Sequence, residues 1–261
     1  MKLKETLVPK KFQLALVTGA TSGLGRVLCL ELARRGIALL LSGRQRAALE
    51  ELKGQLSVPC HIHEGDLTLA ASRHTLIAMI HDLCPDLVIN NAGFGLYGEA
   101  LTHSTEEQLE IIELNVKTLT EITLEAARTL IAKKREGTIV NISSAAGYFV
   151  YPSFNIYAAS KGYVTAFSEA LDSEVAKYNV RVLTVCPGQI ATSFRQRASR
   201  GLKQEKTLWS MSTEKAAHLI LQQIEKGKAV QIIDWRYRFV VFLAKFLIPK
   251  KLLRRILVDF L

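Results

Sequence analysis

The 261-residue sequence has only four cysteines, and their positions show no metal-ligand or disulfide-framework spacing. They are Cys29, Cys60, Cys84 and Cys186. Scattered cysteines of this kind are typical of small buried side chains in a reducing compartment. The histidines add one short pair, His61-x-His63, which we interpret as a strand edge with alternate faces rather than a metal site. We therefore predict no metal site.

A secretory signal, internal repeats and low-complexity linkers are also missing. The segment Met1–Lys11 is polar and basic and contains no apolar stretch of the kind that directs secretion. We find no solenoid-type repeat. The composition, 49% hydrophobic and 22% charged, is that of one compact domain with a substantial core. These features favour a cytoplasmic protein.

Acidic residues are fewer than basic ones, which gives a net charge of +10. Such a charge raises nucleic-acid or membrane binding as alternatives, but most of the excess lies in two regions, and we predict no nucleic-acid partner. The first region contains Arg195, Arg197, Arg200, Lys203 and Lys206. This region either receives an anionic group of a substrate or is only a solvated loop.

The second basic region is the tail, residues 235–261. Phe239–Ala244 and Phe246–Ile248 are apolar around Lys245, a run shorter than the roughly 20 residues that span a bilayer. After Pro249, apolar and basic residues alternate at helical spacing: Leu252, Leu253, Ile256, Leu257 and Phe260 against Lys250, Lys251, Arg254 and Arg255. We predict a basic amphipathic extension that contacts a membrane peripherally, packs on its own domain or covers a partner subunit.

Strand-like and helix-like segments alternate along residues 1–234, which predicts an α/β fold. The predicted strands are 14–17, 38–42, 58–62, 87–89 and 180–185. The predicted helices are 26–35, 46–56, 69–83, 104–132, 157–178 and 213–226. We expect a single-domain, Rossmann-like, doubly wound parallel sheet with helices on both faces and a C-terminal helical extension, residues 235–261.

A glycine-rich turn follows the first predicted strand, in the segment Thr18–Gly25. Its glycines, Gly19, Gly23 and Gly25, permit positive φ and leave room for a phosphate at the N-terminus of a helix. The second predicted strand ends at Gly43-Arg44 with no carboxylate to accept ribose hydroxyls. Arg44 can instead bind a 2′-phosphate, so we predict a preference for NADP.

Tyr157 and Lys161 lie four residues apart in a predicted helix, so their side chains share one face. A phenol titrates near pH ~10, and an adjacent ammonium favours the phenolate. We therefore predict that Lys161 lowers the pKa of Tyr157 and makes it a general acid and base.

From about Phe12 to Asp234 the sequence resembles the short-chain dehydrogenase/reductase family. The motifs that carry the resemblance are Thr18–Gly25, Asp66 in Gly65-Asp66-Leu67-Thr68, Asn90–Gly93, Asn115, Ser144, Tyr157, Lys161 and Pro187-Gly188. The resemblance implies that Tyr157 exchanges a proton with the substrate oxygen, Ser144 holds that oxygen, and Lys161 binds the nicotinamide ribose. It also implies that Asn115 positions a water that connects Lys161 to solvent.

The predicted cofactor-binding residues combine these motifs with the resemblance. They are Gly19, Thr21, Ser22, Gly23, Leu24, Gly25, Arg44, Asp66, Leu67, Asn90, Asn91, Ala92, Gly93, Tyr157, Lys161, Pro187, Gly188, Ile190 and Thr192. Asp66 is equally compatible with a turn residue, and some asparagine groups of Asn90–Gly93 are expected to join neighbouring strands.

The leading prediction is an NADP(H)-dependent oxidoreductase that interconverts a carbonyl and a secondary alcohol on a hydrophobic substrate. The alternative is a catalytically silent NADP-binding sensor or a membrane-associated binding protein. The resemblance further implies a substrate lid at about 192–213, and a homodimer or homotetramer formed through helices near 104–132 and 157–176.

Overall fold

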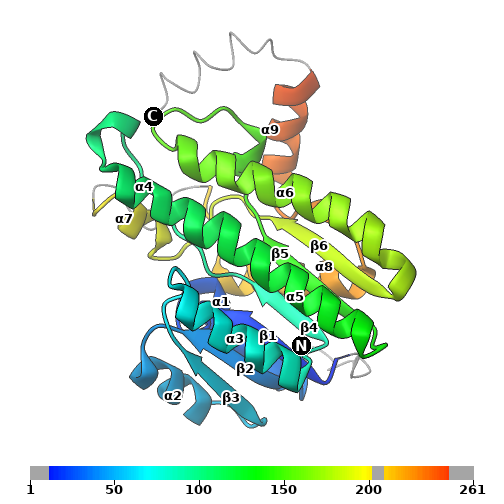
Figure 1. Ribbon diagram of the computed structural model, residues 1–261. Helices are drawn as coiled ribbons and strands as arrows, with labels where there is room; N and C mark the ends of the chain where they lie inside the picture. Colours follow the sequence, from blue (N-terminus) through cyan, green and yellow to red (C-terminus); the bar gives the residue numbers. More distant parts are fainter. Residues whose placement is uncertain (1–11, 202–208, 247–261) are drawn as a thin grey trace, which may run out of the picture.

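Seven parallel strands form the centre of the computed structural model, which describes residues 12–201 and 209–246 (Figure 1). The strands are β1 (Leu14–Thr18), β2 (Ala38–Gly43), β3 (Cys60–Glu64), β4 (Leu87–Asn90), β5 (Gly137–Ile142), β6 (Val180–Cys186) and β7 (Val230–Ile232). Their order across the sheet is β3-β2-β1-β4-β5-β6-β7. The central strands are short apolar runs because both of their faces are buried.

Helices cover both faces of the sheet. They are α1 (Gly23–Arg34), α2 (Arg46–Gly54), α3 (Ala70–Leu83), α4 (Thr105–Ile112), α5 (Leu119–Ala132), α6 (Asn155–Val175), α7 (Phe194–Ala198), α8 (Thr213–Lys226) and α9 (Trp235–Phe246). One core joins the sheet to α1, α2 and α8, and a second core joins it to α3, α5 and α6, which lie over the near face in Figure 1. The fold is the predicted single-domain, Rossmann-like arrangement.

The direction in which the chain builds the sheet reverses beside β1. Strands β1, β2 and β3 succeed one another toward one edge, and the chain then returns to place β4 on the other side of β1. A crevice forms at the carboxyl ends of the strands at such a switch point. The glycine-rich turn after β1 and the segment Asn91–Gly93 after β4 therefore face the same crevice.

Several elements differ from the sequence prediction. The predicted helix 104–132 is divided by a π-helical turn, Glu113–Thr118, into α4 and α5. Strand β3 begins at Cys60 rather than Val58, since Pro59 has no amide hydrogen to donate to the sheet. Strands β5 and β7 and helix α7 go beyond the predicted elements.

The prediction that His61 and His63 lie on alternate faces of a strand is wrong, because residues two positions apart in β3 point to the same face. His61 is exposed, while His63 is buried and hydrogen bonds to Ser42 Oγ and the Ser72 carbonyl. Both residues therefore belong to an ordinary strand.

Helix α9 shows that the C-terminal extension is helical over Trp235–Phe246. Within residues 12–201 and 209–246, no helix combines the length and apolarity needed to cross a membrane. The predicted amphipathic repeat after Pro249 and part of the predicted lid, residues 202–208, lie outside the described residues.

Candidate active site

A cavity of about 910 Å³ lies where β1, β4, β5 and β6 end, and most of the predicted site residues line it. These are Gly19, Thr21, Ser22, Gly23, Leu24, Arg44, Asp66, Leu67, Asn91, Ala92, Gly93, Ser144, Tyr157, Lys161, Pro187, Gly188, Ile190 and Thr192. Three other predicted site residues, Gly25, Asn90 and Asn115, do not line the cavity. The volume is in the range of small-molecule sites.

The glycine-rich turn connects β1 to α1 in a left-handed backbone conformation. Gly19 has φ +65° and Gly23 has φ +51°, which few other residues adopt. A Cβ on Gly25 would lie 2.2 Å from the Gly19 carbonyl oxygen, so Gly25 permits the turn to pack against its helix rather than lining the cavity. The Ser22 side chain caps no amide of α1, and the first turn of α1 carries no acidic residue. This helix end therefore keeps its positive potential and free amides.

The two asparagines after β4 have different roles. Asn90 is buried and donates from Nδ2 to Asn141 Oδ1 at 2.8 Å and Thr123 Oγ1 at 3.0 Å, so it joins β4 to β5 and α5. Asn91 lines the cavity and donates from Nδ2 to the Thr18 carbonyl at 2.9 Å and to the Gly19 carbonyl at 3.3 Å. Asn91 thus holds the glycine-rich turn, whereas Asn90 is one of the strand-joining groups that the sequence predicts.

Arg44 and Asp66 lie at the opposite end of the cavity from Tyr157, after β2 and β3. The Arg44 side chain is 77% exposed, and its Nη1 lies 3.8 Å from Asp66 Oδ2. Asp66 accepts hydrogen bonds from the Thr68 amide at 2.9 Å and the Thr68 hydroxyl at 2.8 Å, which gives it the turn role left open by the sequence. Partial burial opposes ionisation of Asp66, but the Thr68 hydrogen bonds and the Arg44 charge hold its pKa below the ordinary value.

A buried arginine that the sequence analysis does not single out supports the Leu67–Thr68 segment. Arg73 donates to the carbonyls of both residues, and Thr118 Oγ1 donates to the Leu67 carbonyl at 2.7 Å. Glu113 and Glu121 balance the charge of Arg73. Because Glu113 begins the π-helical turn, this network joins the Leu67–Thr68 segment to that turn.

Asn115 lies in the π-helical turn and is fully buried. Its Nδ2 donates to the Phe94 carbonyl at 2.9 Å and its Oδ1 accepts from the Phe94 amide at 3.2 Å. A Cβ on Gly93 would lie 3.0 Å from Asn115 Oδ1 and 3.4 Å from Lys161 Nζ. The glycine therefore leaves a narrow space between Asn115 and Lys161.

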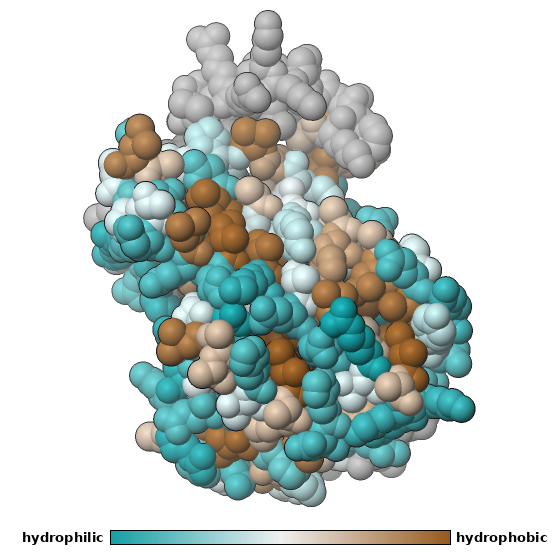
Figure 2. All heavy atoms as spheres, viewed as in Figure 1, coloured by the Kyte–Doolittle hydropathy of each residue, from teal (hydrophilic) through white to brown (hydrophobic). Residues whose placement is uncertain are grey.

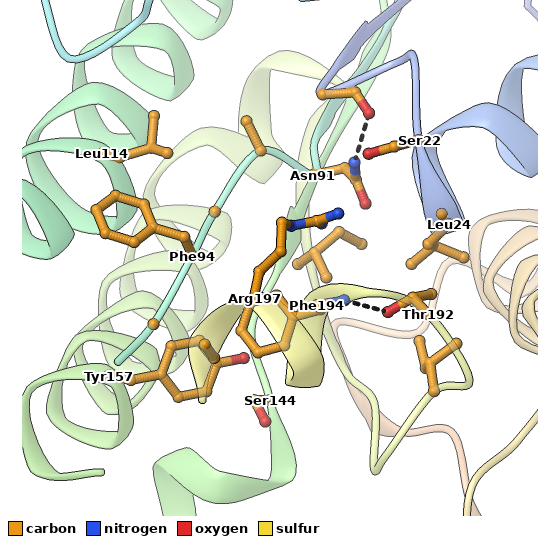
Figure 3. Close-up of a pocket in the computed structure, with 18 of the residues that line it drawn as sticks. Ser22, Leu24, Asn91, Phe94, Leu114, Ser144, Tyr157, Thr192, Phe194 and Arg197 are labelled. Atoms are coloured by element: carbon orange, nitrogen blue, oxygen red, sulfur yellow. Dashed lines mark hydrogen bonds between the residues drawn. The ribbon is translucent and has the colours of Figure 1, made fainter. Parts of the chain in front are cut away.

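Ser144 and Tyr157 come from the loop after β5 and from α6. Both side chains line the cavity, the Ser144 hydroxyl acts on the pKa of Tyr157, and Figure 3 shows the Tyr157 hydroxyl on the side of Ser144. Ser144 Oγ also accepts from the Ala146 amide at 3.1 Å, so it caps a turn as well. Two hydroxyls thus meet at one point of the cavity wall.

Lys161 is buried one helical turn after Tyr157 and donates from Nζ to the Ile142 carbonyl at 2.8 Å. Burial lowers the pKa of Lys161 to about 8. The predicted lowering of the Tyr157 pKa is wrong for this structure: burial raises it to about 12, and the Ser144 hydrogen bond only opposes that rise. The desolvation of Tyr157 outweighs the influence of a buried lysine that is itself readily deprotonated.

The amino-acid sequence that forms this site matches the model of a known protein family. The family model described as short chain dehydrogenase matches residues 13–203. The chain belongs to the short-chain dehydrogenase family. It is therefore a member of an oxidoreductase family with a nucleotide-binding fold, as the sequence predicts.

Several relatives of this short-chain dehydrogenase carry more specific names. Sulfoacetaldehyde reductase 2 of Chromohalobacter salexigens is 32% identical, over 79% of this chain and 86% of the relative. The dehydrogenase/reductase SDR family protein 7-like of Anopheles gambiae is 30% identical, over 83% of this chain and 73% of the relative. The short-chain dehydrogenase of Sphingobium yanoikuyae in complex with NADPH is a structural neighbour at 27% identity and a TM-score of 0.79, covering 84% and 87% of the two chains.

An aromatic wall surrounds Tyr157 in this short-chain dehydrogenase and is absent from the sequence prediction. Phe154 stacks on Tyr97 with ring centroids 3.9 Å apart and on Tyr157 at 4.3 Å, and the Phe194 ring lies 5.4 Å from that of Tyr157. Tyr237 of α9 reaches the cavity over Gly188, where a Cβ would lie 2.1 Å from the Tyr237 ring. The density of aromatic residues between Tyr148 and Tyr157 is the signal that could have revealed part of this wall.

The cavity fits a nicotinamide dinucleotide on its own geometry. The uncapped N-terminus of α1 can receive a pyrophosphate. Arg44 stands at one end, and Ser144, Tyr157 and Lys161 stand at the other. Because Gly93 has no side chain, the Lys161 ammonium lies next to its backbone at the cavity wall.

Proposed function

We propose that this protein is an NADP(H)-dependent oxidoreductase that interconverts a carbonyl and a secondary alcohol. The observation that carries the proposal is the pair of neighbouring hydroxyls, Ser144 and Tyr157, in a cavity that also contains an uncapped helix N-terminus. A protein that only sensed the nucleotide would not need both hydroxyls.

A bound reduced nicotinamide supplies the hydride. Tyr157 donates its phenolic proton to the substrate oxygen, and Ser144 holds that oxygen while negative charge develops on it. Lys161 binds the ribose next to the reacting ring, and Asn115 fixes the Phe94 backbone and the space beside Gly93 through which Tyr157 regains its proton. In oxidation, Tyr157 accepts the proton.

Arg44 gives the preference for NADP. It follows β2 directly, its guanidinium is exposed, and its nearest acidic partner, Asp66, is 3.8 Å away and already bonded to Thr68. A 2′-phosphate offers Arg44 a stronger, bidentate partner. Structural neighbours were solved with either cofactor: the Sphingobium yanoikuyae enzyme with NADPH and 4-hydroxyisoleucine dehydrogenase with NADH.

The substrate is an apolar carbonyl compound. Tyr97, Phe154 and Phe194 form a continuous aromatic surface around Tyr157. Such a surface favours hydrophobic groups. The substrate lid is the stretch at about 192–213, of which Thr192, Phe194, Arg195, Arg197 and Ala198 line the cavity, and the catalytic domain comprises residues 1–234.

Turnover of NADPH with a panel of ketones and aldehydes tests the proposal. We expect saturable binding of NADPH and its oxidation with at least one aromatic carbonyl. Binding without oxidation by any member of the panel would favour the nucleotide-sensor alternative, and the absence of NADPH binding would reject both.

Helix α9 favours a second role, peripheral contact with an anionic membrane. Trp235, Phe239 and Phe242 lie on one side of α9 and are 71%, 58% and 53% exposed, while Tyr237 and Val241 pack inward. The sequence from Trp235 to the C-terminus contains seven lysines and arginines and one aspartate, which complements anionic headgroups. The same helix contacts the cavity through Tyr237, so membrane contact would place the site near lipophilic substrates.

The protein assembles as a homodimer or homotetramer through α4, α5 and α6. Figure 2 shows hydrophobic residues among polar ones along α5 and α6, and Leu109 of α4 and Tyr163 of α6 are 59% and 42% exposed. Side chains of this size are readily covered by a second copy. Sedimentation equilibrium of the wild type and a Leu109→Glu variant tests this surface.

A further inference from the structure

Arg195 is a cavity residue that forms no ion pair within residues 12–201 and 209–246. It lies in α7 directly after Phe194, whose ring is beside Tyr157 (Figure 3). Its Nε is buried and has no hydrogen-bond partner in the part of the chain that the structure describes. Arg197 also lines the cavity and forms no ion pair within the described residues, but it donates to Ser193 Oγ. Arg200 pairs with Glu107.

The surroundings of Arg195 are phenols. Burial raises the pKa values of Tyr97, Tyr151 and Tyr237, and the positive charge of Arg195 opposes the rise in each case. Tyr97 belongs to the aromatic stack that leads through Phe154 to Tyr157. Arg195 therefore lies at the substrate end of the cavity.

The cavity offers this arginine no carboxylate of its own. Asp66 and Glu110 are the acidic residues that line it. Asp66 faces Arg44 at the other end, and Glu110, on α4, forms no ion pair with Arg195 within the described residues. A buried guanidinium nitrogen without a partner is costly, and an anion entering the cavity would relieve that cost.

We propose that Arg195 binds an anionic group of the substrate, so that the preferred substrates are carbonyl compounds with an apolar or aromatic body and a carboxylate or sulfonate. The aromatic wall holds the body, and the guanidinium fork holds the anion while the carbonyl reaches Tyr157. This inference rests on the proposed carbonyl chemistry and adds the substrate class to it.

An alternative source of the anion is the cofactor pyrophosphate. The chain passes the glycine-rich turn at Thr192, whose Cγ2 would be 3.1 Å from a Cβ on Gly23. Three residues later Arg195 lies among tyrosines of the substrate end. This path favours the substrate as the source, and NADPH affinity distinguishes the two.

Matched substrate pairs test the proposal directly. Phenylglyoxylate and 4-formylbenzoate are compared with their methyl esters, which keep the carbon skeleton and remove the charge. We expect wild-type kcat/KM to favour the carboxylate of at least one pair by about tenfold or more. Arg195→Met should remove this preference by raising KM for the carboxylate, and it should leave kcat/KM for the ester and the Kd of NADPH unchanged. Arg195→Lys should retain part of the preference.

Arg200→Met is the matched control, because Arg200 is exposed, pairs with Glu107 and does not line the cavity. It should keep the wild-type preference. Four results would each overturn the inference while leaving the carbonyl chemistry intact. The wild type could prefer the esters, or Arg195→Met could lose equal activity on both members of a pair. Arg197→Met could lose the preference in place of Arg195→Met, or Arg195→Met could bind NADPH more weakly.

If the wild type reduces no carbonyl, the proposed function fails, and equilibrium binding decides the anion site alone. Calorimetry with 4-(hydroxymethyl)benzoate and its methyl ester should then show carboxylate binding that Arg195→Met abolishes. Equal binding of acid and ester would overturn the inference in that case also.

Discussion

Lys161 Nζ lies 5.6 Å from the centroid of the Tyr157 ring, and its hydrogen bond goes to the Ile142 carbonyl. The two side chains share one face of α6, but in this structure the lysine does not lower the tyrosine pKa. Burial acts on both groups in the direction of their neutral forms. The pair is therefore a neutral phenol beside an ammonium that titrates near physiological pH.

The pH profile of reduction should reflect Lys161. Its pKa is lowered to about 8, so its ammonium is present below pH 8 and is lost as the pH rises through that value. Because the ammonium binds the cofactor ribose, kcat/KM for NADPH should fall above about pH 8. Tyr157, with a pKa of about 12, stays protonated over this range. Steady-state kinetics from pH 7 to 10 check the prediction, and a flat or rising profile would contradict it.

Arg44→Ala should weaken NADPH binding by about tenfold, the order expected of one charge-assisted pair at an exposed position, and leave NADH binding nearly unchanged. Fluorescence titration with each cofactor measures the effect. Arg46→Ala is the control, because Arg46 is paired with Glu50 four residues later. Equal losses for NADPH and NADH would remove Arg44 from the 2′-phosphate site.

Asn90→Ala should destabilise the fold without weakening cofactor binding. The change removes buried hydrogen bonds to Thr123 and Asn141, at a cost of about 1–3 kcal/mol. Urea unfolding measures the loss, and NADPH titration of the folded variant should give the wild-type Kd. Asn91→Ala provides the contrast, since it releases the glycine-rich turn and should weaken NADPH binding. A weakened Kd for Asn90→Ala would place Asn90 in the cofactor site after all.

Membrane contact through α9 can be measured by sedimentation with liposomes. The wild type should bind vesicles rich in anionic lipid and bind neutral vesicles weakly. Replacing Trp235 and Phe239 with serine should reduce binding by about tenfold or more, since both apolar side chains are exposed. Tyr178→Ser, on a distant exposed aromatic residue, should have no effect. Unchanged binding of the α9 variant would reject this surface.

The sequence predicts the sheet and most of the cavity because both depend on local patterns. Short apolar strands ending in glycine or asparagine segments placed Gly19 and Asn91 at one edge of the sheet, whereas Ser144 was predicted from the family resemblance alone. The predicted start of β3 was wrong by two residues, because Val58 and Pro59 continue the apolar pattern and only the hydrogen bonding shows that the strand begins at Cys60.

Features that depend on tertiary packing could not be predicted in this way. The π-helical turn at Asn115 is set by its hydrogen bonds to Phe94, and the stack of Tyr97 on Phe154 joins residues 57 positions apart. The direction of the Tyr157 pKa depends on how completely the fold removes it from water. Spacing along a helix shows that Lys161 is near, but it does not show the burial.

The most direct test of the central claim is a comparison of turnover and cofactor binding in Tyr157→Phe. The variant loses the hydroxyl that faces Ser144 and keeps the ring that stacks on Phe154. We predict that NADPH binds with nearly the wild-type Kd while carbonyl reduction falls by about a hundredfold or more. Carbonyl reduction at the wild-type rate by this variant would contradict the account.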